Sequence, residues 1–141
     1  MSEEALRFRF EVDGDNFTSA GQASVQVKKI LRELGVAPET IRRVSIAMYE
    51  GEINMVIHAG GGSADVVVDE QGVEIILKDE GPGIPDIQKA MQEGYSTAPD
   101  NVRSLGFGAG MGLPNMKRYT NKMEIESTPG KGTTITMRVD F

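Results

Sequence analysis

Residues 64–79 read ADVVVDEQGVEIILKD, two runs rich in β-branched residues around a short polar segment that contains Gly72. Runs joined in this way are typical of a β-hairpin. Residues 122–128 (KMEIEST) and 133–141 (TTITMRVDF) alternate in the same manner on either side of the turn sequence PGKG. Two hairpins favour an antiparallel or mixed sheet over the alternating strand and helix order of a parallel one.

The segment before the first hairpin predicts one strand and two helices. Apolar residues alternate over residues 6–12, as in a half-buried strand. Helical spacing of apolar residues predicts a helix from about Ser19 to Leu34, ended by Gly35. A longer helix of roughly six turns is expected from Pro38 to Ala59, before the glycine run at 60–62.

The segment between the two hairpins is less regular. It contains a short helix candidate at residues 86–94, a glycine-rich stretch at 95–112 that suits a mobile loop, and a helix candidate at 113–121. The whole order predicts a two-layer α/β sandwich in which helices cover one face of a mixed, mostly antiparallel sheet. We expect a single domain over residues 1–141.

The composition excludes several classes of protein. The chain has 141 residues and a net charge of -6, which disfavours unspecific binding to nucleic acid or an anionic membrane. No cysteine is present, so disulfides and thiolate chemistry are ruled out. The apolar runs are short and no signal peptide stands out, so a cytoplasmic location is expected. With His58 as the single histidine, a Ser-His-Asp triad is hard to assemble.

Residues 79–85 read DEGPGIP, a strand end followed by two acids and two glycines. Glycines after a strand usually let the backbone turn or let a ligand come close, and phosphate is the usual ligand. A carboxylate repels phosphate, so Asp79 suggests a ligand that presents a hydrogen-bond donor, such as an amino group. The alternative is an exposed acidic turn, since this short pattern is weak alone.

Residues 49–58, YEGEINMVIH, place polar side chains inside the long predicted helix. Glu50, Asn54 and His58 follow one another at four-residue spacing along one face, whereas Glu52 points roughly the other way. A carboxylate beside an amide oxygen suits a general base and a ligand for a hard cation. A solvated polar stripe is the alternative.

Residues 106–116, GFGAGMGLPNM, run four alternating glycines into a predicted helix start. Such a segment can offer backbone N–H groups and the positive end of the helix to phosphates without basic side chains. A flexible surface loop is the alternative. The pattern is neither a Walker A loop nor a dinucleotide fingerprint.

Taken together, EGEINMVIH, DEGPGI, GAGMGLPNM and GKGTTI, in this order, resemble the N, G1 and G2 boxes and the final threonine strand of the GHKL ATPases. The small size and the stretch YSTAPDNVRSLGFGAGMGLPNMKRY look like the bacterial anti-sigma-factor serine/threonine kinases, closest to the stress-signalling switch kinases. The resemblance spans nearly the whole chain and implies a histidine-kinase-like ATPase fold that binds ATP and Mg²⁺.

The resemblance also implies roles for single residues. Asp79 would accept a hydrogen bond from the adenine amino group, with Thr133 nearby. Asn54 would bind Mg²⁺, and Glu50 would act as the general base. Gly81 and Gly83 would let the backbone approach the base. The lid that wraps the phosphates would contain Gly108, Gly110 and Gly112.

The function implied is that of a protein serine/threonine kinase acting on a STAS-domain antagonist protein, with a sigma factor as a second candidate partner. A nucleotide-gated binding module that sequesters a regulator without catalysis is the alternative, and a detached ATPase domain of a larger complex is a third. Retention of Glu50 favours the enzyme. Relatives often form homodimers. His58 could be read as the phosphate acceptor of a two-component histidine kinase, but such kinases carry the acceptor on a separate helix pair, so a packing role or a supporting role behind the site residues is expected.

Overall fold

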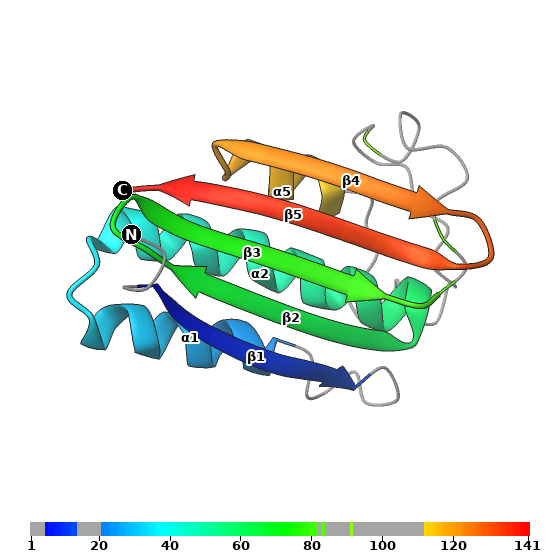
Figure 1. The fold of residues 1–141 in the computed structure, drawn as a ribbon, viewed down its shortest axis with the longest axis horizontal. Coiled ribbons are helices and arrows are strands. Elements are labelled where there is room, and N and C mark those ends of the chain that lie inside the picture. The colour runs from blue at the N-terminus through cyan, green and yellow to red at the C-terminus, as the bar shows by residue number, and fades with distance from the viewer. Residues whose placement is uncertain (1–4, 14–20, 82, 84–90, 92–111) are drawn as a thin grey trace.

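The computed structural model describes residues 5–13, 21–81, 83, 91 and 112–141, the side chain of His58 excepted. Five strands and three helices lie within these residues (Figure 1). In chain order they are β1 (Leu6–Asp13), α1 (Gln22–Glu33), α2 (Pro38–Ala59), β2 (Gly61–Val68), β3 (Gly72–Asp79), α5 (Gly112–Arg118), β4 (Lys122–Thr128) and β5 (Gly132–Asp140). The predicted helix at 86–94 and nearly all of the glycine-rich stretch at 95–112 lie outside the described residues.

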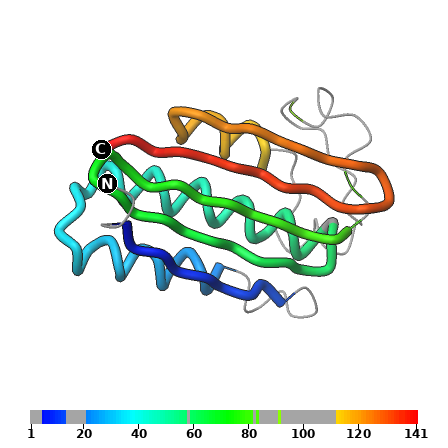
Figure 2. Tube along the Cα trace, viewed as in Figure 1, coloured from blue at the N-terminus to red at the C-terminus, as the bar shows by residue number. Residues whose placement is uncertain are grey.

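The strands form one sheet in the order β1-β2-β3-β5-β4. Each neighbouring pair is antiparallel, so both predicted hairpins are confirmed and no described pairing is parallel. The described helices all lie on one face of the sheet, with α2 behind its middle and α1 behind the β1 edge (Figures 1 and 2). This arrangement confirms the predicted α/β sandwich. The two hairpins join through β5, which lies between β3 of the first hairpin and its own partner β4.

The core lies between the sheet and the helices. Alternate residues of β5 are buried, from Thr133 to Val139, because successive side chains of a strand point to opposite faces. The corresponding face of β3 buries Val73, Ile75 and Leu77, and α2 covers them with Val44 and its apolar neighbours. This packing holds α2 firmly against the strands that carry the candidate site.

Helix α2 keeps its predicted bounds. It begins at Pro38, where the missing N–H costs nothing, and ends at Ala59, followed by Gly60 in the left-handed conformation with φ 72°. Gly51 lies in its interior, where glycine costs about 1 kcal/mol against alanine. A Cβ atom there would overlap Leu77 and approach Met116 Sδ to 3.5 Å. Close packing of α2 on β3 and α5 therefore explains the glycine.

Candidate active site

Asp79 is the last residue of β3 and pairs with Thr133 of β5. Its Oδ1 accepts hydrogen bonds from the backbone N–H of Gly81 (3.0 Å) and of Thr133 (3.2 Å). Among the described residues no donor reaches Oδ2, and no Lys or Arg forms an ion pair with this carboxylate. One oxygen is thus fixed by the backbone, and the other can accept a hydrogen bond from a ligand.

Thr133 lies beside Asp79 on the helix-facing side of the sheet. Its side chain is buried, and its hydroxyl forms a hydrogen bond with the Ser127 hydroxyl at 3.0 Å. Thr134 follows on the opposite face of β5, as the alternation of a strand requires. Asp79 and Thr133, which are expected to lie together near the adenine, are therefore neighbours in the structure.

Gly81 and Gly83 each have a packing reason within the protein itself. A Cβ atom on Gly81 would come within 2.6 Å of Ala59 at the end of α2. Gly83 has φ 82°, and a Cβ atom there would come within 2.7 Å of the Thr128 carbonyl oxygen. These contacts bring the segment after Asp79 against the end of α2 and the end of β4. Their predicted role beside the base stays a prediction.

Two predicted site residues lie on α2, and both are half-buried. Glu50 Oε2 accepts a hydrogen bond from Asn115 Nδ2 at 2.9 Å, across the contact between α2 and α5. Asn54 lies one turn further along and makes no hydrogen bond through its amide to another described residue. Of the predicted lid glycines, Gly112 begins α5, while Gly108 and Gly110 lie outside the described residues.

Glu52 makes a buried contact that the sequence patterns did not predict. Only 2% of it is exposed, and its carboxylate accepts three backbone N–H groups at the start of α1, from Gly21, Ala23 and Ser24, at 2.6–3.1 Å. Burial raises the pKa of Glu52, and the hydrogen bonds offset part of this rise. The carboxylate therefore joins the start of α1 to the middle of α2.

A signal for this contact was present in the sequence of α1. The helix begins after Gly21 without an acidic residue in its first turn and without a side-chain cap. The first N–H groups of a helix have no partner inside it and need an acceptor from elsewhere. The absence of an acidic residue from the first turn was visible in the sequence, but it left open what would accept these N–H groups, and only the structure identifies Glu52.

Asp79 lies near the end of α2, and the other two candidate side chains, Asn54 and Glu50, follow along that helix. Ala59, at the end of the helix, contacts Gly81 of the segment after Asp79. At 1.5 Å per residue, Asn54 lies about 8 Å and Glu50 about 14 Å back along the axis. The Asp79 acceptor, the Asn54 amide and the Glu50 carboxylate therefore occur in that order, which suits an elongated ligand.

A family model described as histidine kinase-, DNA gyrase B- and HSP90-like ATPase matches residues 39–141. This match covers every element from α2 to β5, including each candidate residue that the structure places. The chain belongs to this family of ATPases.

Within this family, the chain is similar to two characterised kinds of bacterial regulatory protein. The chain is 36% identical to the serine/threonine-protein kinase RsbT of Bacillus subtilis over 112 residues, 77% of this chain and 78% of that protein. It is 33% identical to the anti-sigma F factor of Clostridium acetobutylicum over 146 aligned positions, 100% of this chain and 96% of the relative.

Two solved structures share the fold. One holds the RsbU and RsbW domains of a Mycobacterium tuberculosis protein, with a TM-score of 0.65 and 17% identity, over 95% of this chain and 32% of that one. The other is the SiaB–SiaC complex from Pseudomonas aeruginosa, with a TM-score of 0.58 and 10% identity, over 98% of this chain and 91% of that one. At such identities the likeness concerns the fold alone.

Proposed function

We propose that the chain is an ATP-dependent serine/threonine protein kinase that phosphorylates an antagonist protein of the STAS type in a partner-switching pathway. The observation that carries the proposal is the order of the candidate groups: the Asp79 acceptor at the end of β3, near the end of α2, then Asn54 and Glu50 further back along that helix. The names of the relatives RsbT and anti-sigma F factor support it. A sigma factor as second partner, a homodimer and a cytoplasmic location belong to the same proposal.

The base of the nucleotide would bind at the Asp79 end. An adenine amino group can donate to Oδ2, which no described residue engages, while the backbone N–H groups on Oδ1 keep the carboxylate oriented. Guanine presents a carbonyl oxygen at the corresponding ring position, which a carboxylate would repel. The site should therefore prefer adenine nucleotides, and Thr133, Gly81 and Gly83 would surround the base.

The metal would bind at Asn54. Mg²⁺ usually takes one or two protein oxygens, and substrate phosphates and water complete its shell. The half-buried Asn54 amide has no partner among the described residues, so its oxygen fits such a role. Bound Mg²⁺ would neutralise phosphate charge, which matters in a chain of net charge -6. The glycines at 108, 110 and 112 would add backbone N–H groups.

Glu50 would accept the proton of the attacking serine or threonine hydroxyl. Its carboxylate is half-buried and bears a hydrogen bond from a neutral amide, so no described cation cancels its charge. General-base assistance of this kind contributes about 10² to 10⁴ in rate. Phosphoryl transfer otherwise depends mainly on positioning and on charge neutralisation.

The test uses Glu50→Gln and a panel of purified STAS-domain proteins, with label transfer from γ-labelled Mg²⁺-ATP as the readout. Transfer should fall by about 10² or more, while Mg²⁺-ADP affinity measured by calorimetry stays within about twofold. Glu52→Gln is the matched control, because it is the same change two residues away. It should lower stability and leave the transfer rate of the folded protein near the parental value.

Parental transfer by Glu50→Gln would remove the base assignment. If the parent protein binds Mg²⁺-ADP tightly and transfers no label to any STAS-domain protein of the panel, the alternative function, a nucleotide-gated binding module, replaces the kinase. Asn54→Ala separates the metal role, since it should weaken binding of the nucleotide with Mg²⁺ but not binding measured in EDTA.

A further inference from the structure

Asn115 links the helix after the glycine-rich stretch to the candidate base. It lies on α5, and its Nδ2 donates to Glu50 Oε2 at 2.9 Å, although 65 residues separate the two in the chain. Neither the sequence patterns nor the resemblance gave Asn115 a role. Its amide is half-buried, so the bond is partly shielded from water.

The backbone around Asn115 is held in place by its neighbours. Leu113 and Met116 of α5 are buried at 6% and 0% exposure, and Met116 packs over Gly51, the residue after Glu50. At the other end of α5, Arg42 of α2 lies over the Tyr119 ring at 5.3 Å. These contacts hold α5 against α2 and place Asn115 beside Glu50.

The hydrogen bond from the Asn115 amide suits a general base at Glu50 better than an ion pair with Lys or Arg would. A glutamate side chain has several free torsions, so holding it in one conformation costs conformational entropy. A neutral amide donor can hold one carboxylate oxygen without cancelling the charge, whereas a Lys or Arg would neutralise it. Oε2 is engaged by Asn115 and no described residue donates to Oε1, so Oε1 can accept a proton.

We propose that Asn115 is a positioning residue for phosphoryl transfer, which orients the Glu50 carboxylate so that Oε1 faces the incoming hydroxyl. The inference rests on the proposed function of Glu50 as general base. Misplacement of a reacting group by about 1 Å can cost 10²-fold in rate. Loss of the amide bond should therefore affect the transfer step far more than nucleotide binding.

The alternative is that the hydrogen bond between Asn115 and Glu50 only stabilises the contact between α5 and α2. In that case removal would lower the melting temperature by a few degrees, as the loss of one hydrogen bond usually does, and leave the rate of the folded protein unchanged. The packing of Leu113 and Met116 makes this separable, because α5 keeps its apolar contacts when the amide is lost.

The experiment compares Asn115→Asp, which keeps the shape and replaces the donor by an acceptor, with Asn115→Ala. In the label-transfer assay, kcat should fall roughly tenfold to hundredfold in both, with KM for Mg²⁺-ATP within about twofold. Thermal unfolding measured alongside shows that the variants are folded. Asn121→Ala is the control, since the amide oxygen of Asn121 accepts the Asp140 N–H at the opposite end of the sheet. It should leave kcat unchanged.

A double-mutant cycle with Glu50→Gln decides the mechanism. If Asn115 acts through Glu50, the Asn115 substitution should reduce the residual rate of Glu50→Gln by less than about twofold. Independent, multiplying losses would overturn the proposal, as would parental kcat in both single Asn115 variants. If Glu50→Gln keeps the parental rate, the base assignment fails and this inference falls with it. A slow Glu50→Gln beside fully active Asn115 variants overturns the inference alone.

Discussion

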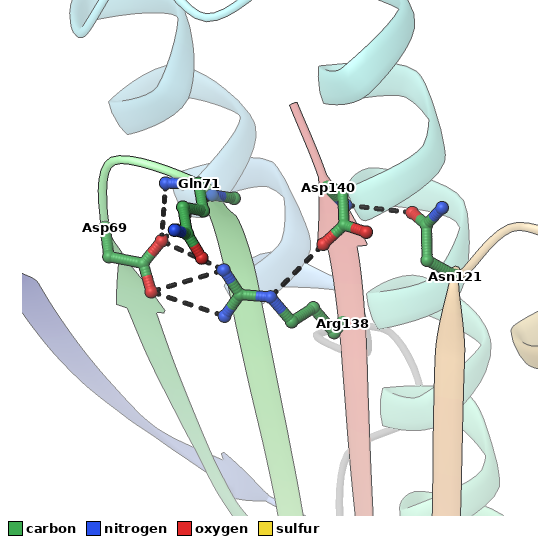
Figure 3. Close-up of polar contacts among 6 residues, drawn as sticks. Asp69, Gln71, Asn121, Arg138 and Asp140 are labelled. Atoms are coloured by element: carbon green, nitrogen blue, oxygen red, sulfur yellow. Dashed lines mark hydrogen bonds and ion pairs between the residues drawn. The ribbon is translucent and has the colours of Figure 1, made fainter.

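The two ends of β3 carry aspartates in similar local structures with opposite surroundings. Asp69, just before β3, accepts the backbone N–H of Gln71, and Asp79, at its end, accepts that of Gly81. Asp69 also receives the Arg138 guanidinium, at 3.0–3.3 Å (Figure 3), whereas the described residues offer Asp79 no side-chain cation. A neutralised carboxylate closes a turn, and an unneutralised one remains able to bind a ligand.

The Asp69 end is a closed network. Arg138 bridges Asp69 and Asp140, and Asn121 accepts the Asp140 N–H, so the turn between β2 and β3, the end of β5 and the turn before β4 meet there (Figure 3). The Arg138 and Asp69 side chains are 27% and 32% exposed, which makes this the best shielded of the described ion pairs. Both carboxylates of this network, Asp69 and Asp140, are paired with Arg138. We therefore expect this end of β3 to contribute to the stability of the fold rather than to ligand binding.

The largest expected effect is that of Asp79→Asn on nucleotide binding. The amide presents either a donor or a single acceptor to the adenine amino group, and leaving buried polar groups mismatched costs about 1–3 kcal/mol. Mg²⁺-ADP affinity should therefore fall roughly 100-fold in calorimetric titration. The parent protein should bind Mg²⁺-GDP no better than this variant binds Mg²⁺-ADP.

Asp69→Asn is the matched substitution at the other end of β3. Mg²⁺-ADP affinity should stay within about twofold of the parent, since the network of Figure 3 lies at the opposite end of the strand. An equal loss of affinity in both variants would show that the two ends do not differ in function, and the assignment of Asp79 to the adenine would be abandoned.

The next effect concerns stability at the closed end. Arg138→Met leaves Asp69 and Asp140 near each other without their shared cation. We expect a loss of about 1–2 kcal/mol in the free energy of unfolding, measured in urea, because charge-assisted hydrogen bonds contribute more than neutral ones. Nucleotide affinity should not change.

Lys122→Met provides the control on the same side of the sheet. Its ion pair with Glu124 at 3.1 Å has side chains that are 70% and 60% exposed. Exposed pairs of this kind contribute between about 0 and 1 kcal/mol. A larger loss from Lys122→Met than from Arg138→Met would contradict the view that shielding makes the Arg138 network the stabilising one.

The sequence allowed the local elements to be predicted because their signals are short-range. Pro38 and Gly60 mark the ends of α2, and alternation marks the strands. The position of β5 between β3 and β4 depends on how whole strands pack, which periodicity does not encode. The pairing of Asp79 with Thr133 was expected only through the resemblance to a known family.

The contacts that orient the candidate site were not predictable in the same way. Glu52 accepts N–H groups 28–31 residues away, and Asn115 lies 65 residues from Glu50. A helical wheel correctly separates the faces of Glu50 and Glu52 but gives no partner to either. Gly51, which is unfavourable by propensity alone, becomes intelligible once Leu77 and Met116 are seen against it.

The smallest effect is the pH dependence of the Asp69 contribution. Hydrogen bonds from Arg138, together with those from the backbone of Gln71 and Gly72, hold the pKa of Asp69 below its ordinary value of 3.8. The unfolded chain therefore binds this proton at higher pH than the folded chain does, so the contribution is complete above pH 3.8 and is lost as pH falls through the folded pKa.

The stability difference between the parent and Asp69→Asn should be about 1 kcal/mol at pH 7 and should shrink below about pH 4, as urea unfolding at stepwise lower pH can measure. A difference that grows on acidification would mean that Arg138 does not favour the charged form of Asp69, and the contrast with Asp79 would lose its electrostatic basis.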